Sequence, residues 1–237
     1  LAAQALIETE ADLRLLEHQG EQGTFAVEAA DASALQLLAG RVPLVLGPHL
    51  NVYSRAALVE HAGLGAARWV APVELPLDAV ARVNPRDDRV PAGDGRVFET
   101  EVWAFGRVPL SFSARCFTAR HHHLAKDQCG YRCLADPDGL AMHSSDNQPF
   151  LVLNGTQTQS AAVQCLLGDA AALRAAGVQR LRLSPCAHGF GAVLADFDAI
   201  FNGGAEAAAA TSAIERWPGL GVPGPLANGY AHRRPGM

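Results

Sequence analysis

The chain has 237 residues, a formal net charge of −5 and a pI near 6.0, with 49% hydrophobic and 18% charged residues. This is the composition of a soluble globular protein that is long enough for one large core. The acidic balance and the lack of a basic stripe argue against binding to nucleic-acid phosphates. No uncharged apolar run is long enough to predict a membrane span.

The cysteines favour a reducing compartment. There are five, an odd number, and three of them lie within eighteen residues. A secreted disulfide scaffold would be shorter and richer in cysteine, so we predict a cytoplasmic protein that uses cysteines as ligands. The chain begins without Met, inside a hydrophobic pattern, and we expect that its true N-terminal segment is missing.

Short apolar runs alternate with amphipathic stretches through the first hundred residues. Such alternation predicts parallel βαβ units, and nearly continuous apolar runs such as V-P-L-V-L-G are typical of strands covered on both faces. The predicted strands are 1–7 (a stub), 24–29, 42–47, 68–73 and 97–105, and the predicted helices are 10–20, 32–40, 54–65 and 77–83.

The alternation breaks after residue 105. Residues 106–150 are rich in His, Cys, Asp, Gly and Pro and predict an irregular, cysteine-rich insertion without a confident helix. Regular structure is expected again as a strand at 150–153, a helix at 160–176, a strand at 178–184 and a helix at 192–201, before a Gly/Pro-rich tail.

These elements predict an α/β fold with about six major strands. A complete (β/α)₈ barrel takes roughly 250 residues, and part of this chain is diverted into the insertion. We therefore predict one TIM-like (β/α) barrel domain over residues 1–237 that lacks its N-terminal βα units. An open doubly wound sheet remains an alternative, although neither glycine-rich nucleotide motif is present.

Three cysteines form the most informative motif. Cys116, Cys129 and Cys133 are spaced C-x12-C-x3-C and are surrounded by charged residues. Thiolates are the usual ligands of iron–sulfur clusters and of structural zinc. A four-iron cluster needs four ligands, so one is missing from the motif. Chance clustering of small hydrophobic cysteines is the alternative.

Other potential ligands are weaker. His121, His122 and His123 suggest a mixed zinc shell, but consecutive side chains diverge, and a solvated loop is the simpler interpretation. Cys165 is expected to pack in the core within the predicted helix 160–176. Cys186 follows a predicted strand and is a reserve candidate for the fourth ligand.

Polar residues follow three consecutive predicted strands. Glu28 ends the first, His49 and Asn51 follow the second, and Glu74 ends the third. In a parallel barrel the C-terminal strand ends surround the mouth, where chemistry usually takes place. These four residues are therefore candidates for a polar pocket, with helix capping and solvent exposure as the alternatives. Glu99 and Glu101 are spaced for one face of the next strand.

The cysteine motif also carries a resemblance. S-A-R-C-F-T-A-R, K-D-Q-C and the following Cys133 resemble the central signature of the UbiV-type proteins, a branch of the collagenase-like, peptidase-related family. Further stretches agree in the same order. They are V-E-A-A-D, W-V-A-P-V-E-L, V-L-N-G-T-Q-T, R-L-S-P and N-G-Y.

The resemblance implies a barrel that holds a [4Fe–4S] cluster on Cys116, Cys129 and Cys133. In this family the fourth ligand is an earlier cysteine, and none precedes Cys116 here, so we expect it in the missing N-terminal segment. The implied function is that of an iron–sulfur subunit of a hydroxylase that acts on the ring of a ubiquinone precursor without O₂. The implied partners are a UbiU-like protein in a heterodimer and a sterol-carrier-like lipid-binding protein, and the implied oxygen donor is a metabolite such as prephenate.

Further polar residues in the matching stretches extend the possible pocket. Asn154, Gln157 and Thr158 lie in the N-G-T-Q-T match, where a tight turn is an equally good interpretation. Arg115 and Arg120 lie in the stretch around Cys116 and are candidates to hold an anionic donor by bidentate hydrogen bonds or to neutralise the thiolates. Two alternatives to the hydroxylase remain open. One is a collagenase-like peptidase with a structural zinc site, and the other is an interaction subunit without a cofactor.

Overall fold

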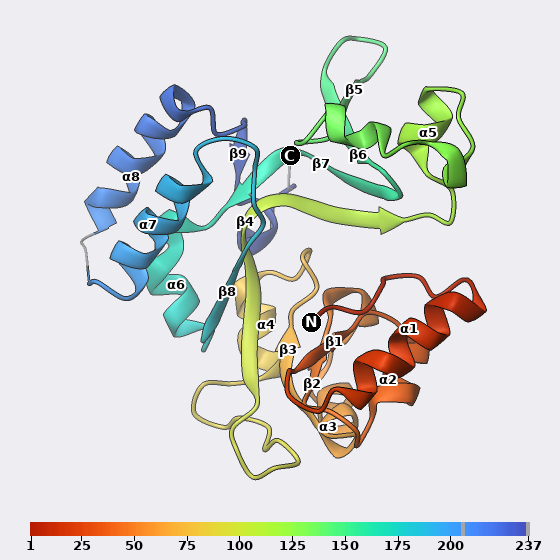
Figure 1. Cartoon of the computed structure of the whole chain (residues 1–237). Coiled ribbons are helices and arrows are strands. Elements are labelled where there is room, and N and C mark those ends of the chain that lie inside the picture. Colours follow the sequence, from red (N-terminus) through yellow and green to blue (C-terminus); the bar gives the residue numbers. More distant parts are fainter. Residues whose placement is uncertain (205–206, 236–237) are drawn as a thin grey trace. The chain divides into compact units, whose positions relative to one another are not determined.

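The computed structural model describes residues 1–204 and 207–235 (Figure 1). The chain has a mixed α/β fold with a curled, mostly parallel sheet that is consistent with part of a barrel. Its internal contacts define two compact units, which are described separately. The first unit comprises Leu1–Val102 and Ala171–Leu181, and the second comprises Trp103–Ala170 and Arg182–Met237.

The first unit contains the parallel part of the sheet. Its strands follow the order β1-β2-β3-β4, each parallel to the next, with Val27 opposite Leu44 and Arg68 opposite Glu99. Figure 1 shows these strands with their connecting helices. The elements are α1 (Glu10–Glu21), β1 (Val27–Ala29), α2 (Ala32–Leu38), β2 (Leu44–Leu46), η1 (Pro48–Leu50), α3 (Arg55–Gly63), β3 (Ala66–Val70), α4 (Leu77–Val83) and the start of β4 (Glu99–Phe112).

The predicted strand–helix alternation is confirmed in this unit. Thr9, Asp31 and Ser54 each accept a hydrogen bond from a backbone N–H in the first turn of the following helix, as side-chain caps do. Trp69 and Phe98 are fully buried and belong to the core that β3 and β4 share. Strands β1, β2 and β3 are shorter than predicted, and the stub at 1–7 forms only an isolated bridge between Ala2 and Glu28.

The second unit is dominated by antiparallel pairing. The later part of β4 pairs with β7, β7 with β6 and β6 with β5. Phe105 lies at the centre of its core, with the Trp217 ring 5.5 Å away, edge-on. The remaining elements of the chain are α5 (Phe117–His121), η2 (Lys126–Gln128), η3 (Arg132–Ala135), β5 (Leu140–His143), β6 (Pro149–Asn154), β7 (Gln157–Cys165), η4 (Leu167–Asp169), α6 (Ala170–Ala175), β8 (Arg180–Leu183), α7 (Phe190–Phe201), α8 (Ala207–Arg216), η5 (Trp217–Leu220), β9 (Leu226–Ala227) and η6 (Tyr230–His232).

Three predictions for this part of the chain were wrong. The helix expected at 160–176 is strand β7 followed by the short helix α6, because residues 160–165 are buried on both faces and the chain turns at Gly168. The insertion is more regular than expected, since β4 continues to Phe112 and a short helix and two strands follow. Helix α8 was missed within the tail.

The sequence predicts no membrane-spanning segment, and the helices of the described residues test this prediction. None of them is long and apolar enough to cross a bilayer.

Candidate functional site

The polar strand ends of the first unit come together in part. The Tyr53 hydroxyl donates a hydrogen bond to Oε1 of Glu74, and Oδ1 of Asn51 lies 3.4 Å from the same hydroxyl. Asn51 adopts a left-handed conformation at the end of η1, with φ of 57°, which asparagine tolerates better than most residues. Tyr53 therefore connects two of the four predicted pocket residues, and sequence reasoning missed it.

The other two residues of that prediction lie on neighbouring segments. Glu28 is on β1, and its carboxylate lies against Gly47, where an added Cβ would come within 3.1 Å of Oε1. His49 lies in η1, directly after β2. Burial and the hydrogen bond to the negatively charged Glu74 raise the pKa of Tyr53 to about 12, so the hydroxyl is a neutral donor at physiological pH.

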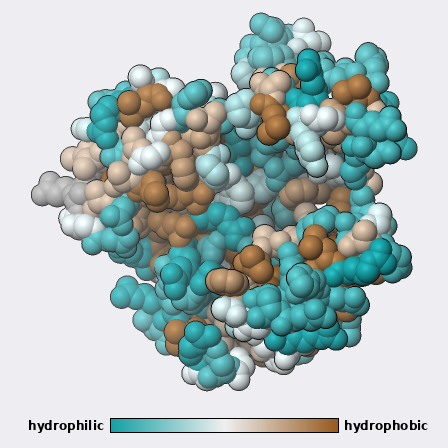
Figure 2. All heavy atoms as spheres, viewed as in Figure 1, coloured by the Kyte–Doolittle hydropathy of each residue, from teal (hydrophilic) through white to brown (hydrophobic). Residues whose placement is uncertain are grey.

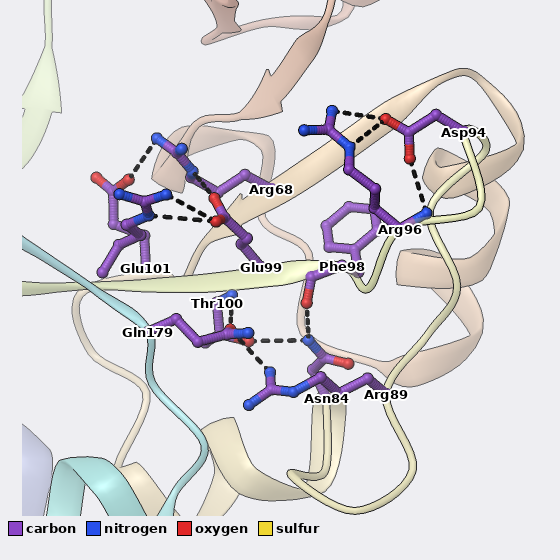
Figure 3. Close-up of polar contacts among 11 residues, drawn as sticks. Arg68, Asn84, Arg89, Asp94, Arg96, Phe98, Glu99, Thr100, Glu101 and Gln179 are labelled. Atoms are coloured by element: carbon purple, nitrogen blue, oxygen red, sulfur yellow. Dashed lines mark hydrogen bonds and ion pairs between the residues drawn. The ribbon is translucent and has the colours of Figure 1, made fainter.

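A second polar network in this unit joins β3, β4 and β8 (Figure 3). Nε of Arg68 donates to Glu99 over 2.8 Å, and its Nη1 lies 3.5 Å from Glu101. Arg180 binds the other carboxylate oxygen of Glu99 at 2.9 Å. The prediction that Glu99 and Glu101 share one face is confirmed, and their partners give both carboxylates a structural role.

A cavity of about 510 Å³ lies beside this network, at the N-terminal ends of the parallel strands. Its lining is mainly apolar and includes Leu44, Val97 and the polar Gln179. In parallel barrels this end contributes to stability, and chemistry takes place at the opposite end.

The three motif cysteines lie on one short segment of the second unit. Cys116 caps α5, and its Sγ accepts a hydrogen bond from the Ala119 N–H at 3.4 Å. Cys129 ends η2, and Cys133 lies in η3, which packs against α5. All three are half-buried thiols outside any disulfide. Among the described residues, however, no three His, Cys, Asp or Glu side chains converge as a metal site requires.

The basic residues around this segment point to solvent. Arg115 and Arg120 are exposed, as are His121 and His123, and Figure 2 shows a mainly hydrophilic surface over α5. His122 differs, since its Nε2 is buried and has no hydrogen-bond partner in the described part of the chain. The interpretation of the three histidines as a solvated loop therefore holds for two of them.

The two remaining cysteines have different environments. Cys165 is buried, as predicted, although in β7 instead of a helix, and burial raises the pKa of its thiol to about 11. Burial and, next, the charge of Asp138 raise the pKa of Cys186, whose Sγ donates to the His188 carbonyl at 3.0 Å.

A cavity of about 290 Å³ within the second unit brings several predicted residues together. Asn154 and Cys186 both line it, although neither was expected beside the other. Arg107 on β4 lines it as well and was missed by sequence reasoning. The only sequence signal was a single arginine within the apolar run F-G-R-V-P-L.

Comparison with known proteins adds no assignment. No family model matches the chain, and no solved structure matches it. A functional interpretation therefore depends on the residues themselves.

Proposed function

We propose that this chain is the cysteine-bearing subunit of a cytoplasmic, O₂-independent hydroxylase that acts on the ring of a ubiquinone precursor. Its ligand set comprises Cys116, Cys129 and Cys133 for a [4Fe–4S] cluster, and its partner is a UbiU-like protein. In this proposal the parallel sheet of the first unit is part of a TIM-like barrel. The proposal rests on the C-x12-C-x3-C motif together with the other stretches of the chain that resemble the UbiV-type proteins.

The local chemistry of the motif supports cysteine ligation. The three thiols are neither oxidised to disulfides nor fully buried, and exposed arginines flank Cys116. Cysteine binds metal as its thiolate. A bound cluster supplies one-electron redox chemistry, and its potential depends on exposure and on hydrogen bonds to sulfur.

The fit between these residues and a cluster is incomplete. The donor atoms suit iron, but the described thiols do not converge, and the motif supplies only three of four ligands. Cluster binding therefore requires the segment between Cys116 and Cys133 to close around the metal. Cys186, in the same unit, is a candidate for the fourth thiolate.

The proposal is tested by purifying the whole natural protein without oxygen and measuring iron and acid-labile sulfide. We expect about four of each per chain and a brown protein. Replacing Cys116, Cys129 or Cys133 by Ser should remove most of the iron and sulfide, whereas Cys165→Ser, in the core, is the matched control that should retain them. A colourless wild type without iron contradicts the proposal, and zinc in its place supports the peptidase-like alternative. Loss of iron in Cys186→Ser identifies that residue as the fourth ligand.

A further inference from the structure

The cavity of the second unit is formed by strands that approach unusually closely. Gly106 on β4 has a φ of +114°, and an added Cβ would lie 2.5 Å from the Cβ of Ser184. The approach is reinforced by a hydrogen bond from the Ser184 N–H to the Phe105 carbonyl at 2.8 Å. A glycine is therefore required where β4 meets the segment that leads to Cys186. The approach places Arg107 in the lining of a preformed pocket.

Arg107 is a half-buried cation that forms no ion pair with a carboxylate of the described residues. Its Nη1 donates to the Ser160 carbonyl at 3.1 Å and also to the Ala161 carbonyl. Its Nε is buried and has no acceptor in the part of the chain that the structure describes. Burial lowers the pKa of Arg107, and the charge of Asp138, which also lines the cavity, partly offsets this lowering. The two side chains form no ion pair, and Oδ1 of Asp138 accepts the Ala187 N–H at 2.8 Å. A half-buried charge that no ion pair compensates is unfavourable.

Neutral hydrogen-bond donors face the same space. The Gln159 side-chain amide donates to Oε1 of Gln157 at 2.6 Å, which fixes the Gln157 carboxamide and leaves its NH₂ group without a partner among the described residues. The Asn154 side chain, at the β6–β7 turn, likewise forms no side-chain hydrogen bond with another described residue. The cavity thus combines one guanidinium with amide donors, and its lining is more polar than apolar.

We infer that this cavity binds a small carboxylate, with the Arg107 guanidinium as its counterion and the amides of Gln157 and Asn154 as further donors. A guanidinium held at one nitrogen presents its other N–H groups in fixed directions, which suits a planar carboxylate. The cavity of about 290 Å³ lies at the lower end of the range for ligand sites, which limits the ligand to a small organic acid. This inference stands independently of the proposed cluster.

The test is calorimetric titration of the whole protein with lactate, malate and inorganic phosphate, together with the neutral amide of lactate. We expect one of the carboxylates to bind and the neutral amide not to bind. Arg107→Gln should weaken carboxylate binding at least about tenfold, as expected for loss of a charge-assisted hydrogen bond. Arg132→Gln removes the same charge from an exposed position of the same unit and should leave the affinity unchanged.

A second variant keeps the test decisive if Arg107→Gln does not fold. Gln157→Glu is nearly isosteric and places a negative charge in the cavity, so it should abolish carboxylate binding while the protein stays folded by circular dichroism. The inference is overturned when folded wild type binds no carboxylate at millimolar concentration, when only phosphate binds, or when Gln157→Glu leaves the affinity unchanged.

Discussion

Arg68 and Arg107 are both partly buried arginines on strands, yet their surroundings differ. Arg68, in the first unit, is bound by the carboxylates of Glu99 and Glu101 (Figure 3). Arg107, in the second unit, is bound by two backbone carbonyls and forms no ion pair among the described residues, although the charge of Asp138 acts on it from a distance. A cation paired with carboxylates of its own chain is explained by folding alone, whereas a half-buried cation without an ion pair is a candidate site for an added anion. The difference separates a structural network from a candidate ligand site.

The largest expected effect concerns Gly106, which forms the wall of the site around Arg107. Gly106→Ala should destabilise the protein by roughly 3 kcal/mol or more, since it combines an unfavourable φ with a clash against Ser184. Gly155→Ala is the matched control, because its φ of +63° causes strain but nothing lies within 4 Å of the added Cβ. It should cost about 1 kcal/mol. Urea unfolding measures both, and equal losses would show that the close approach is not essential.

The next prediction compares the two arginines directly. Arg68→Met should cost about 2 kcal/mol, since it removes a partner from two carboxylates that are largely shielded from solvent. Arg107→Met should change stability by less than about 1 kcal/mol, because the lost hydrogen bonds are offset by removal of a half-buried charge that no ion pair compensates. The free energies of unfolding of the two variants test this prediction. A larger loss of stability in Arg107→Met than in Arg68→Met would contradict the difference proposed between the two arginines.

A smaller effect on stability is expected when the pH is lowered. Burial, the largest single influence, would raise the pKa of Glu99, but hydrogen bonds from Arg180 and Arg68 together lower it below 4.5. A carboxylate with a depressed pKa stabilises the fold above its unfolded pKa, and this stability is lost as the pH falls through the folded pKa. Glu99→Gln should therefore weaken the fold near pH 7 by about 1 kcal/mol and flatten its pH dependence. Unfolding curves between about pH 7 and pH 3 test this, and parallel profiles for the two proteins would rule it out.

The smallest expected effect is on the reactivity of the Cys165 thiol and not on the stability of the fold. Its pKa of about 11 leaves roughly 100-fold less thiolate at pH 8 than the ordinary value of 9.0 would. Alkylation followed by mass spectrometry should therefore modify Cys165 last. The half-buried Cys186, whose pKa is also raised, should react before it. Early modification of Cys165 in folded protein would contradict its burial.

The regular parts of the fold could be predicted because local signals agreed with each other. Ser54 caps α3 as expected, because apolar periodicity and a capping side chain mark the same boundary there. Helix α4 also has the predicted bounds, 77–83. Residues 160–165 gave no such agreement. Small residues such as Ala161 and Ala162 fit a helix by propensity, but pairing with β4 and β6 buries them in a strand.

The sites could be predicted only where residue type was informative. Cysteine spacing drew attention to Cys116, and strand ends drew it to Asn51 and Glu74. The roles of Tyr53 and Arg107 depend on hydrogen bonds to residues 21 and 53 or more positions away, and no local pattern encodes such contacts. Sequence reasoning selected Arg115 and Arg120, which are exposed, and missed the half-buried Arg107.

The proposed cluster is tested most directly by electron paramagnetic resonance of the whole protein, purified without oxygen and reduced with dithionite. The account predicts an iron–sulfur signal that persists in Cys165→Ser and disappears in Cys129→Ser. A reduced wild type that gives no iron-dependent signal, in a sample that analysis shows to be free of iron and sulfide, would contradict it.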